Sequence, residues 1–263
     1  MKLSISNIGW DSVADEVVYK YLSSVGVDGI EIAPTRIFPE APYGKLKEAE
    51  QFRKKLKDQY KLSISSMQSI WYRKEEKIFR SETERKLLLE YTKSAIDFAS
   101  VLDCGNLVFG CPQNRVMYDE KDYELAVKFF FDLGEYAYQK GTVLSLEPNP
   151  VIYNTNFINT TEEAISMVKR VGSKGFKVNL DIGTVIYNEE NLEGIESNID
   201  LIHHIHISEP RLALIEQRKL HNQLMELLSG RYHNYISIEM GKREKLQEIF
   251  ESVAYVKEVF DGL

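Results

Sequence analysis

The sequence has little cysteine, no long apolar run and no excess of positive charge. Two of its 263 residues are cysteines, Cys104 and Cys111, and their spacing matches no CxxC motif. A disulfide framework is therefore not expected, and the pair suits a reducing compartment. No stretch approaches the roughly 18 consecutive apolar residues of a spanning helix, and MKLSISNIGW at the N-terminus lacks the apolar core of a signal peptide. We therefore expect a cytoplasmic protein with no membrane partner.

The charge balance is acidic. The chain has 33 Lys and Arg against 40 Asp and Glu, which gives a formal net charge of −7. A general nucleic-acid binder gains its affinity by neutralising phosphates with Lys and Arg, so no nucleic-acid partner is expected. The chain also lacks a linker, a low-complexity tract or a shift in composition that would divide it. We therefore expect a single domain over residues 1–263.

Short β-rich runs alternate with amphipathic stretches along the whole chain. The expected strands cover residues 2–6, 29–33, 62–67, 106–109, 143–147, 177–181, 202–208 and 235–239. The expected helices cover residues 12–24, 46–60, 82–102, 121–140, 161–171, 189–198, 214–228 and 243–260. Strict alternation implies parallel pairing through right-handed crossovers. Eight units of about 33 residues each predict a single-domain α/β fold, the (β/α)₈ TIM barrel.

Within the strands, apolar and polar residues alternate with a period of two. In the fifth strand Leu144 and Leu146 alternate with Ser145 and Glu147, and strands six to eight follow the same rule. The apolar set must face the helices, so the polar set faces the barrel axis. A doubly wound sheet would instead need apolar side chains on both faces. A polar interior is costly unless its groups are paired or bind a ligand, which indicates a functional site.

The last inward positions of strands five to eight are Glu147, Asp181, His206 and Glu239. Adjacent parallel strands would bring these three carboxylates and one imidazole to the C-terminal end of the barrel, where barrel enzymes place their chemistry. Neighbouring carboxylates repel one another, and a divalent cation removes that repulsion. The donor set suits Mn²⁺, Co²⁺ or Mg²⁺, with Zn²⁺ as a further candidate. A hydrogen-bonded network without metal is the alternative.

These strand ends also carry a family resemblance. The motifs LEPNP, NLDIG, HIHISEP and SIEM, at strands five to eight, resemble those of the xylose-isomerase-like TIM barrels, as does NLVFGCPQNR at strand four. The nearest group is that of the sugar-phosphate isomerases/epimerases and ketose 3-epimerases, which share the superfamily with endonuclease IV. The resemblance implies that Glu147, Asp181, His206 and Glu239 bind one divalent metal. It also implies that Glu147 and Glu239 act as catalytic acid and base.

Three departures from the family pattern limit which residue roles can be transferred from the family to this sequence. Thr184 stands where the epimerases and nucleases commonly have a histidine, three residues after the strand-six Asp. Leu212, with Arg211 one position early, stands where the ketose 3-epimerases have an arginine, so the substrate contacts of that subgroup are not transferred. The nucleases need further ligands for a three-zinc cluster, and the five histidines, three of them bunched at 203–206, do not supply these.

The ligand set predicts a chemistry. A hydroxyketone or hydroxyaldehyde chelates a divalent metal, Mn²⁺ being expected, which stabilises an enediolate as a proton leaves carbon. Return of a proton by the second glutamate gives epimerisation or aldose–ketose isomerisation of a sugar or sugar phosphate. Two alternatives stay open: a dehydratase of the same superfamily acting on an inosose-like or dehydroshikimate-like substrate, and a non-catalytic polyol-binding barrel. A homo-oligomer is also left open.

Six further residues are candidates for binding the substrate. Some follow strand three, others lie in loops above the expected metal, and one lies in the seventh helix, where an ordinary helix histidine is the alternative. They are Gln68, Trp71, Asn149, Asn156, Glu209 and His221. Trp71 is interpreted either as the floor of a sugar pocket or as a packed aromatic. The alternation along the seventh strand predicts that His203 faces the helices. Arg115 is interpreted either as a member of a surface salt bridge or as a phosphate ligand.

Overall fold

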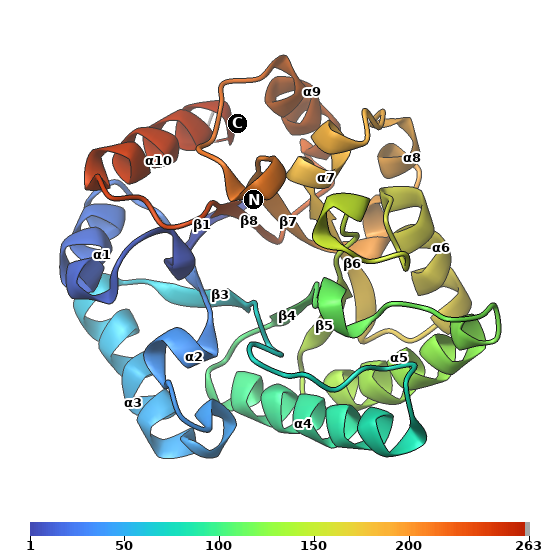
Figure 1. Cartoon of the computed structure of the whole chain (residues 1–263). Coiled ribbons are helices and arrows are strands. Elements are labelled where there is room, and N and C mark those ends of the chain that lie inside the picture. The colour runs from blue at the N-terminus through green and yellow to red at the C-terminus, as the bar shows by residue number, and fades with distance from the viewer. Residues whose placement is uncertain (261–263) are drawn as a thin grey trace.

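Eight short strands pair in chain order and close into a barrel in the computed structural model, which describes residues 1–260 (Figure 1). Every strand is parallel to its neighbours, and β1 pairs with β8 to close the ring. The strands are β1 (Lys2–Ser6), β2 (Gly29–Ile32), β3 (Ser63–Met67), β4 (Asn106–Phe109), β5 (Val143–Leu146), β6 (Phe176–Asp181), β7 (Ile202–Ser208) and β8 (Tyr235–Glu239). Their bounds agree with the predicted ones to within one residue at each end. The predicted (β/α)₈ barrel is confirmed.

Helices form a ring around the barrel (Figure 1). They are α1 (Asp15–Ser24), α2 (Pro34–Ile37), α3 (Leu46–Lys55), α4 (Glu82–Val101), α5 (Asp122–Gln139), α6 (Thr161–Val171), α7 (Ile182–Tyr187), α8 (Glu193–Glu196), α9 (Lys219–Leu228) and α10 (Leu246–Phe260). Local signals fix several of their ends. The Thr160 side chain accepts a hydrogen bond from the Glu163 amide while the Glu163 carboxylate accepts one from the Thr160 amide, and Gly172 ends α6 with a φ of 69°. These are a capping box and a left-handed glycine cap.

The helix predicted for residues 189–198 is wrong. The chain instead turns into α7 immediately after Asp181, and α8 covers only Glu193–Glu196 of the predicted range. The reason is the Asp181 carboxylate, which accepts a hydrogen bond from the Thr184 backbone N–H and thereby caps α7. Asp181 is thus both a candidate metal ligand and the N-cap of α7.

The main core lies between the barrel and the helices. Leu144 and Leu146 of β5 point into it and are fully buried. Phe130 of α5 packs on Phe176 of β6 with ring centroids 4.8 Å apart. Aromatic rings at this spacing gain energy beyond the burial of their area. No helix within residues 1–260 is long and apolar enough to cross a membrane.

The barrel interior is polar, as the period of two predicted. The inward side chains include Ser4, Ser6, Glu31, Ser66, Asn106, Ser145, Asn179, His204 and Ser237, all buried. Many of them bond to one another across strands: the Asn106 amide, for example, donates to Ser66 and accepts from Ser145. Pairing of this kind offsets the cost of burying polar groups.

Candidate metal centre and active site

Four side chains from neighbouring strands meet at the C-terminal end of the barrel. Glu147 directly follows β5, Asp181 and Glu239 end β6 and β8, and His206 lies in β7 opposite Asp181. One ligand atom from each of the four lies within 4.8 Å of the others. His206 Nδ1 is 3.0 Å from Glu147 Oε1, 3.3 Å from Glu239 Oε2 and 4.0 Å from Asp181 Oδ2. The structure therefore brings together the four residues that the sequence singled out.

Burial and mutual repulsion shape the charge of this cluster. Burial, with the charge of Glu147 adding to it, raises the pKa of Asp181 to about 6 and that of Glu239 to about 7. Burial would lower the pKa of His206, but the carboxylates of Glu31 and Glu239 raise it well above its ordinary value. Without a metal, the imidazolium thus neutralises part of the carboxylate charge. Three oxygen donors and one nitrogen donor around one point fit a divalent cation, which would replace the Nδ1 proton.

The sequence did not identify Glu31 as a site residue. Its position between Ile30 and Ile32 nevertheless predicted that its side chain faces the barrel axis, because side chains alternate along a strand. Its Oε2 lies 3.0 Å from His206 Nε2 and 3.2 Å from His204 Nε2. Burial would raise the pKa of this carboxyl, but the two histidines hold it well below its usual range. A carboxylate bonded to the far nitrogen orients a ligating imidazole and raises its basicity. Glu31 therefore turns Nδ1 of His206 toward the other three residues.

The Glu147 carboxylate is held on both oxygens. Asn179 Nδ2 donates to Oε1 at 2.9 Å, and Asn149 Nδ2 donates to Oε2 at 3.0 Å. Asn149 is fixed in turn by Arg115, whose Nη2 donates to Asn149 Oδ1 at 2.6 Å and to the Glu147 carbonyl at 2.8 Å. Arg115 is fully buried, so the interpretation as a surface salt bridge or phosphate ligand is wrong. Burial lowers its pKa to about 10.

Asp181 is fixed by the segment that follows it. The Thr184 backbone N–H and hydroxyl lie 2.6 and 2.8 Å from Asp181 Oδ1, and the Ser208 hydroxyl donates to Oδ2. Thr184, the residue that departs from the family pattern, therefore orients this carboxylate. A side chain held by three donors is preorganised for a ligand.

A cavity of about 210 Å³ opens above the cluster. It is lined by Glu147, Asp181 and Glu239 and, among the predicted substrate contacts, by Gln68, Asn149 and Glu209. Tyr153, which the sequence reasoning did not single out, lines it as well, and burial together with the nearby carboxylates raises its pKa to about 12. No Lys or Arg is among the described residues that line this cavity. The cations that face its carboxylates, His206 beneath the cluster and Arg218 behind Glu209, are thus not part of the cavity wall itself.

Three predicted substrate contacts lie outside this cavity. Trp71 packs edge-on against Phe109, with ring centroids 4.7 Å apart, and its Nε1 donates a hydrogen bond to Thr92. Of its two interpretations, the packed aromatic is therefore the one that the structure supports. Asn156 is exposed, and its side chain bonds to the backbone of Met117. His221 is buried, with Nδ1 2.8 Å from the Tyr255 hydroxyl.

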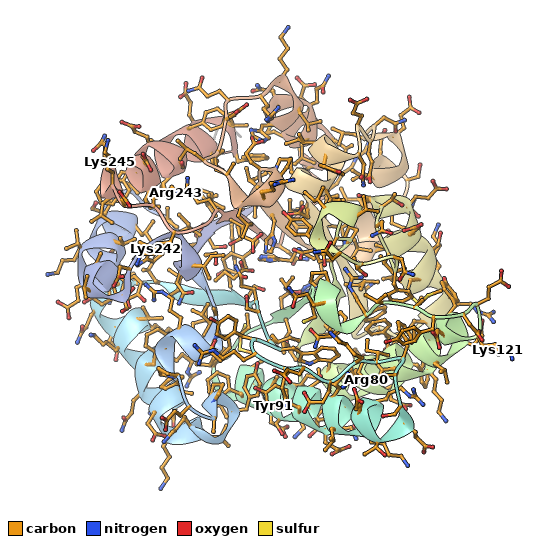
Figure 2. The ribbon with its side chains drawn as sticks, viewed as in Figure 1. Arg80, Tyr91, Lys121, Lys242, Arg243 and Lys245 are labelled. Carbon is orange, nitrogen blue, oxygen red and sulfur yellow. The ribbon has the colours of Figure 1, made fainter. Side chains whose placement is uncertain are left out.

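The loop between β8 and α10 carries Lys242, Arg243 and Lys245 (Figure 2). Lys242 Nζ pairs with Asp11 at 2.5 Å, and Arg243 Nε donates to the Gly241 carbonyl at 2.8 Å. None of the three is among the residues lining the cavity. The cations of this loop are therefore not placed to neutralise the carboxylate cluster.

We expect buried His221 to make the protein less stable in acid. Burial lowers its pKa to about 4, whereas an unfolded histidine has a pKa near 6.5. The unfolded chain binds more protons between these values, so stability is lost as pH falls through this window. In urea unfolding, His221→Gln should reduce the loss of stability between pH 7 and pH 5 by about 2 kcal/mol. His233→Gln, at an exposed position, is the control, and equal pH dependence in both variants would contradict this.

Comparisons with known proteins place the chain among related barrels. A search of curated protein sequences finds no match. Among solved structures, 3-keto-D-glucoside 4-epimerase from E. coli is 19% identical with a TM-score of 0.78, covering 98% of this chain and 99% of that one. A D-psicose 3-epimerase crystallised in the presence of D-fructose is 18% identical with a TM-score of 0.79, and each chain is covered completely. At these identities the likeness shows the fold.

A third relative has a different activity. The probable 3-DHS dehydratase of petrobactin synthesis from Bacillus anthracis is 16% identical, with a TM-score of 0.71 and 98% of each chain covered. The fold is thus shared by proteins described as epimerases and as a dehydratase. The sequence profile of the xylose isomerase-like TIM barrel family matches residues 19–259, nearly the whole chain. The chain therefore belongs to the xylose isomerase-like TIM barrel family.

Proposed function

We propose that this protein is a divalent-metal-dependent isomerase or epimerase of a sugar. The observation that carries the proposal is the convergence of Glu147, Asp181, His206 and Glu239 at the base of a cavity at the C-terminal end of the barrel. Epimerases of sugars among the structures with this fold support it. Within the broader class of sugars and sugar phosphates, the acidic lining without Lys or Arg among the described residues favours an unphosphorylated substrate.

The four residues would hold one divalent cation, His206 through Nδ1, with Glu31 fixing the ring from behind. Mn²⁺ is the proposed ion, and Co²⁺, Mg²⁺ and Zn²⁺ are the alternatives to be tested. When bound, such an ion supplies Lewis-acid stabilisation of negative charge on a carbonyl oxygen and its neighbouring hydroxyl.

Glu147 and Glu239 are the proposed acid and base. They come from β5 and β8, which are three positions apart in the ring of strands, so they approach the cavity from different sides. One carboxylate removes a proton from the carbon beside the substrate carbonyl, and the other returns a proton. Return to the same carbon from the opposite face inverts it and gives an epimer. Return to the former carbonyl carbon, with transfer of the hydroxyl proton, gives an isomer.

Substrate contacts are assigned to side chains that reach the cavity. Gln68, Asn149 and Glu209 are retained in this role. Glu209 is itself fixed by Arg218, whose Nε and Nη2 donate to its two oxygens at 2.7 and 2.6 Å. Trp71, Asn156 and His221 are left out, because none of them lines the cavity.

Deuterium exchange tests the proposal directly. Metal-loaded protein is incubated in D₂O with a panel of ketoses and aldoses and their phosphates, and products are analysed by mass spectrometry and NMR. An epimerase or isomerase incorporates deuterium at a carbon and otherwise preserves the mass of the substrate. Loss of water would replace the proposal with the dehydratase alternative. Saturable binding without exchange would replace it with the non-catalytic polyol-binding barrel.

The glycine that follows β4 provides a test of the Glu147 position. A Cβ atom on Gly110 would lie 2.5 Å from Glu147 Oε2, closer than any real contact, so Gly110→Ala must displace this carboxylate. We expect turnover to fall by about 10–100-fold, since a misplacement of about 1 Å in a reacting group has effects of this size. Gly105→Ala is the matched control, because Gly105 lies just before the same strand and a Cβ atom there would meet no atom of the described residues within 4 Å beyond its chain neighbours. Equal turnover of the two variants would contradict the role of Glu147.

A further inference from the structure

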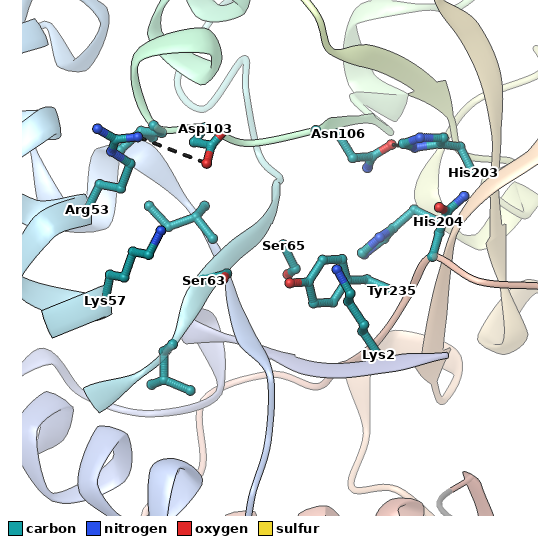
Figure 3. A pocket seen from close by; sticks show the side chains of 15 residues that line it. Lys2, Arg53, Lys57, Ser63, Ser65, Asp103, Asn106, His203, His204 and Tyr235 are labelled. Carbon is teal, nitrogen blue, oxygen red and sulfur yellow. Dashed lines mark hydrogen bonds and ion pairs between the residues drawn. The ribbon is translucent and has the colours of Figure 1, made fainter. Parts of the chain in front are cut away.

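A second cavity, of about 310 Å³, opens at the opposite end of the barrel, where the strands begin. We call it the lower cavity, and Lys2, Ser63, Asn106, His203 and Tyr235, at the starts of five different strands, mark its walls (Figure 3). Its volume is at the lower end of the range for small-molecule sites, roughly 300–1,000 Å³. The lower cavity is therefore large enough for one small molecule, and it is separate from the proposed active site.

Polar groups in the wall of the lower cavity lack partners. Ser65 is 3% exposed, and its hydroxyl makes no hydrogen bond to any of residues 1–260. Arg53 Nε is also buried and unpaired, although the guanidinium as a whole is partly exposed. A buried polar atom without a partner costs about 1–3 kcal/mol. A ligand that accepts hydrogen bonds from these donors would remove that cost.

The charge around the lower cavity is positive. Lys2, Arg53 and Lys57 line it, the last two from α3 and the helical turn that follows it (Figure 3). Asp103 is the one carboxylate among the described lining residues, and its side chain is 80% exposed and 4.0 Å from Arg53 Nη1. Such an arrangement attracts an anion, and the planar fork of an arginine matches the oxygens of a phosphate group.

We propose that the lower cavity binds a small phosphate-bearing anion. Arg53 and Lys57 would contact the phosphate oxygens, and the Ser65 hydroxyl would take the remaining hydrogen bond within the cavity. The contrast between the two ends of the barrel supports this assignment, because the cavity at the C-terminal end is lined by four carboxylates and by no cation among the described residues. The inference does not depend on the proposed sugar chemistry.

Isothermal titration calorimetry of the full chain tests the site, with inorganic phosphate and glycerol 3-phosphate as probes at constant ionic strength. We expect saturable binding that weakens at least tenfold in Arg53→Gln and in Lys57→Gln. Lys54→Gln is the matched control, because Lys54 is exposed on the same helix and pairs with Glu50. Tighter binding of one probe identifies the free ion or the phosphate monoester as the ligand.

Two results would overturn the proposal. The first is the absence of saturable binding of either probe to the wild-type chain. The second is equal affinity in wild type, Arg53→Gln and Lys57→Gln, which would place the anion elsewhere, for example at the metal centre. Lys57 is exposed, so Lys57→Gln is expected to fold, and its far-ultraviolet circular dichroism checks this.

Discussion

Glu239→Gln is expected to lower kcat by about 10³-fold or more, and Glu147→Gln by a similar factor. Glutamine keeps the size of glutamate and can still accept hydrogen bonds, but it cannot remove a proton from carbon. Each variant is assayed for turnover and for incorporation of solvent deuterium. Elemental analysis of the same samples separates the loss of a proton-transfer group from the loss of a metal ligand.

The two substitutions should also be strongly non-additive. Because one glutamate removes the proton and the other returns one in the same turnover, removing the second adds little once the first is gone, so the double variant should resemble either single variant. Glu244→Gln, at an exposed position shortly after β8, is the control and should retain full turnover. A variant at Glu147 or Glu239 that keeps more than about one-tenth of wild-type turnover would exclude that residue as the acid or base.

Removal of divalent metal is expected to abolish turnover, and added Mn²⁺ should restore it. The three carboxylates around His206, of which Asp181 and Glu239 are buried and Glu147 is partly buried, repel one another without a cation, so binding should also stabilise the fold. At a concentration about 100 times the Kd, a ligand contributes about 2.7 kcal/mol, which corresponds to a rise in Tm of about 5 °C or more for a chain of this size. Activity assays and thermal melts of chelated and reloaded protein measure both effects.

His206→Ala provides the matching variant. It removes the single nitrogen donor of the cluster and leaves Glu31 without its main partner, so metal content should fall and the rise in Tm with Mn²⁺ should disappear. Full activity of metal-free protein would eliminate the proposed mechanism. Purified protein without bound divalent ion, and without gain on adding Mn²⁺, would favour the hydrogen-bonded network instead.

The sequence predicted the strands and the cluster well because both depend on local patterns. The period of two fixes which side chain of a strand faces the axis, and the end of a strand fixes its height in the barrel. Glu147 and Asp181 could therefore be placed without knowledge of the fold's details. Glu31 was not assigned to the site because it lies before the end of its strand, and no sequence spacing reports its contact with His206 on β7, three positions away in the ring of strands.

Two further misses have physical causes. His203 was predicted to face a helix, but the pairing of β6 with β7 shifts register there, which leaves His203 as an extra residue. It turns instead toward the lower cavity, with Nδ1 3.0 Å from Asn106 Oδ1. Trp71 could not be separated from a sugar-binding aromatic because its packing partners, such as Phe109, come from another strand.

The capping of α7 by Asp181 has a consequence for the local unfolding of the protein. A short helix such as Ile182–Tyr187 opens locally more easily than the barrel strands, and its first amides depend on the Asp181 carboxylate. Each such opening releases Asp181 Oδ1 from Thr184 and loosens the carboxylate. If Asp181 holds the proposed ion, release of that ion should therefore depend on the same local opening that allows hydrogen exchange at the amides of α7.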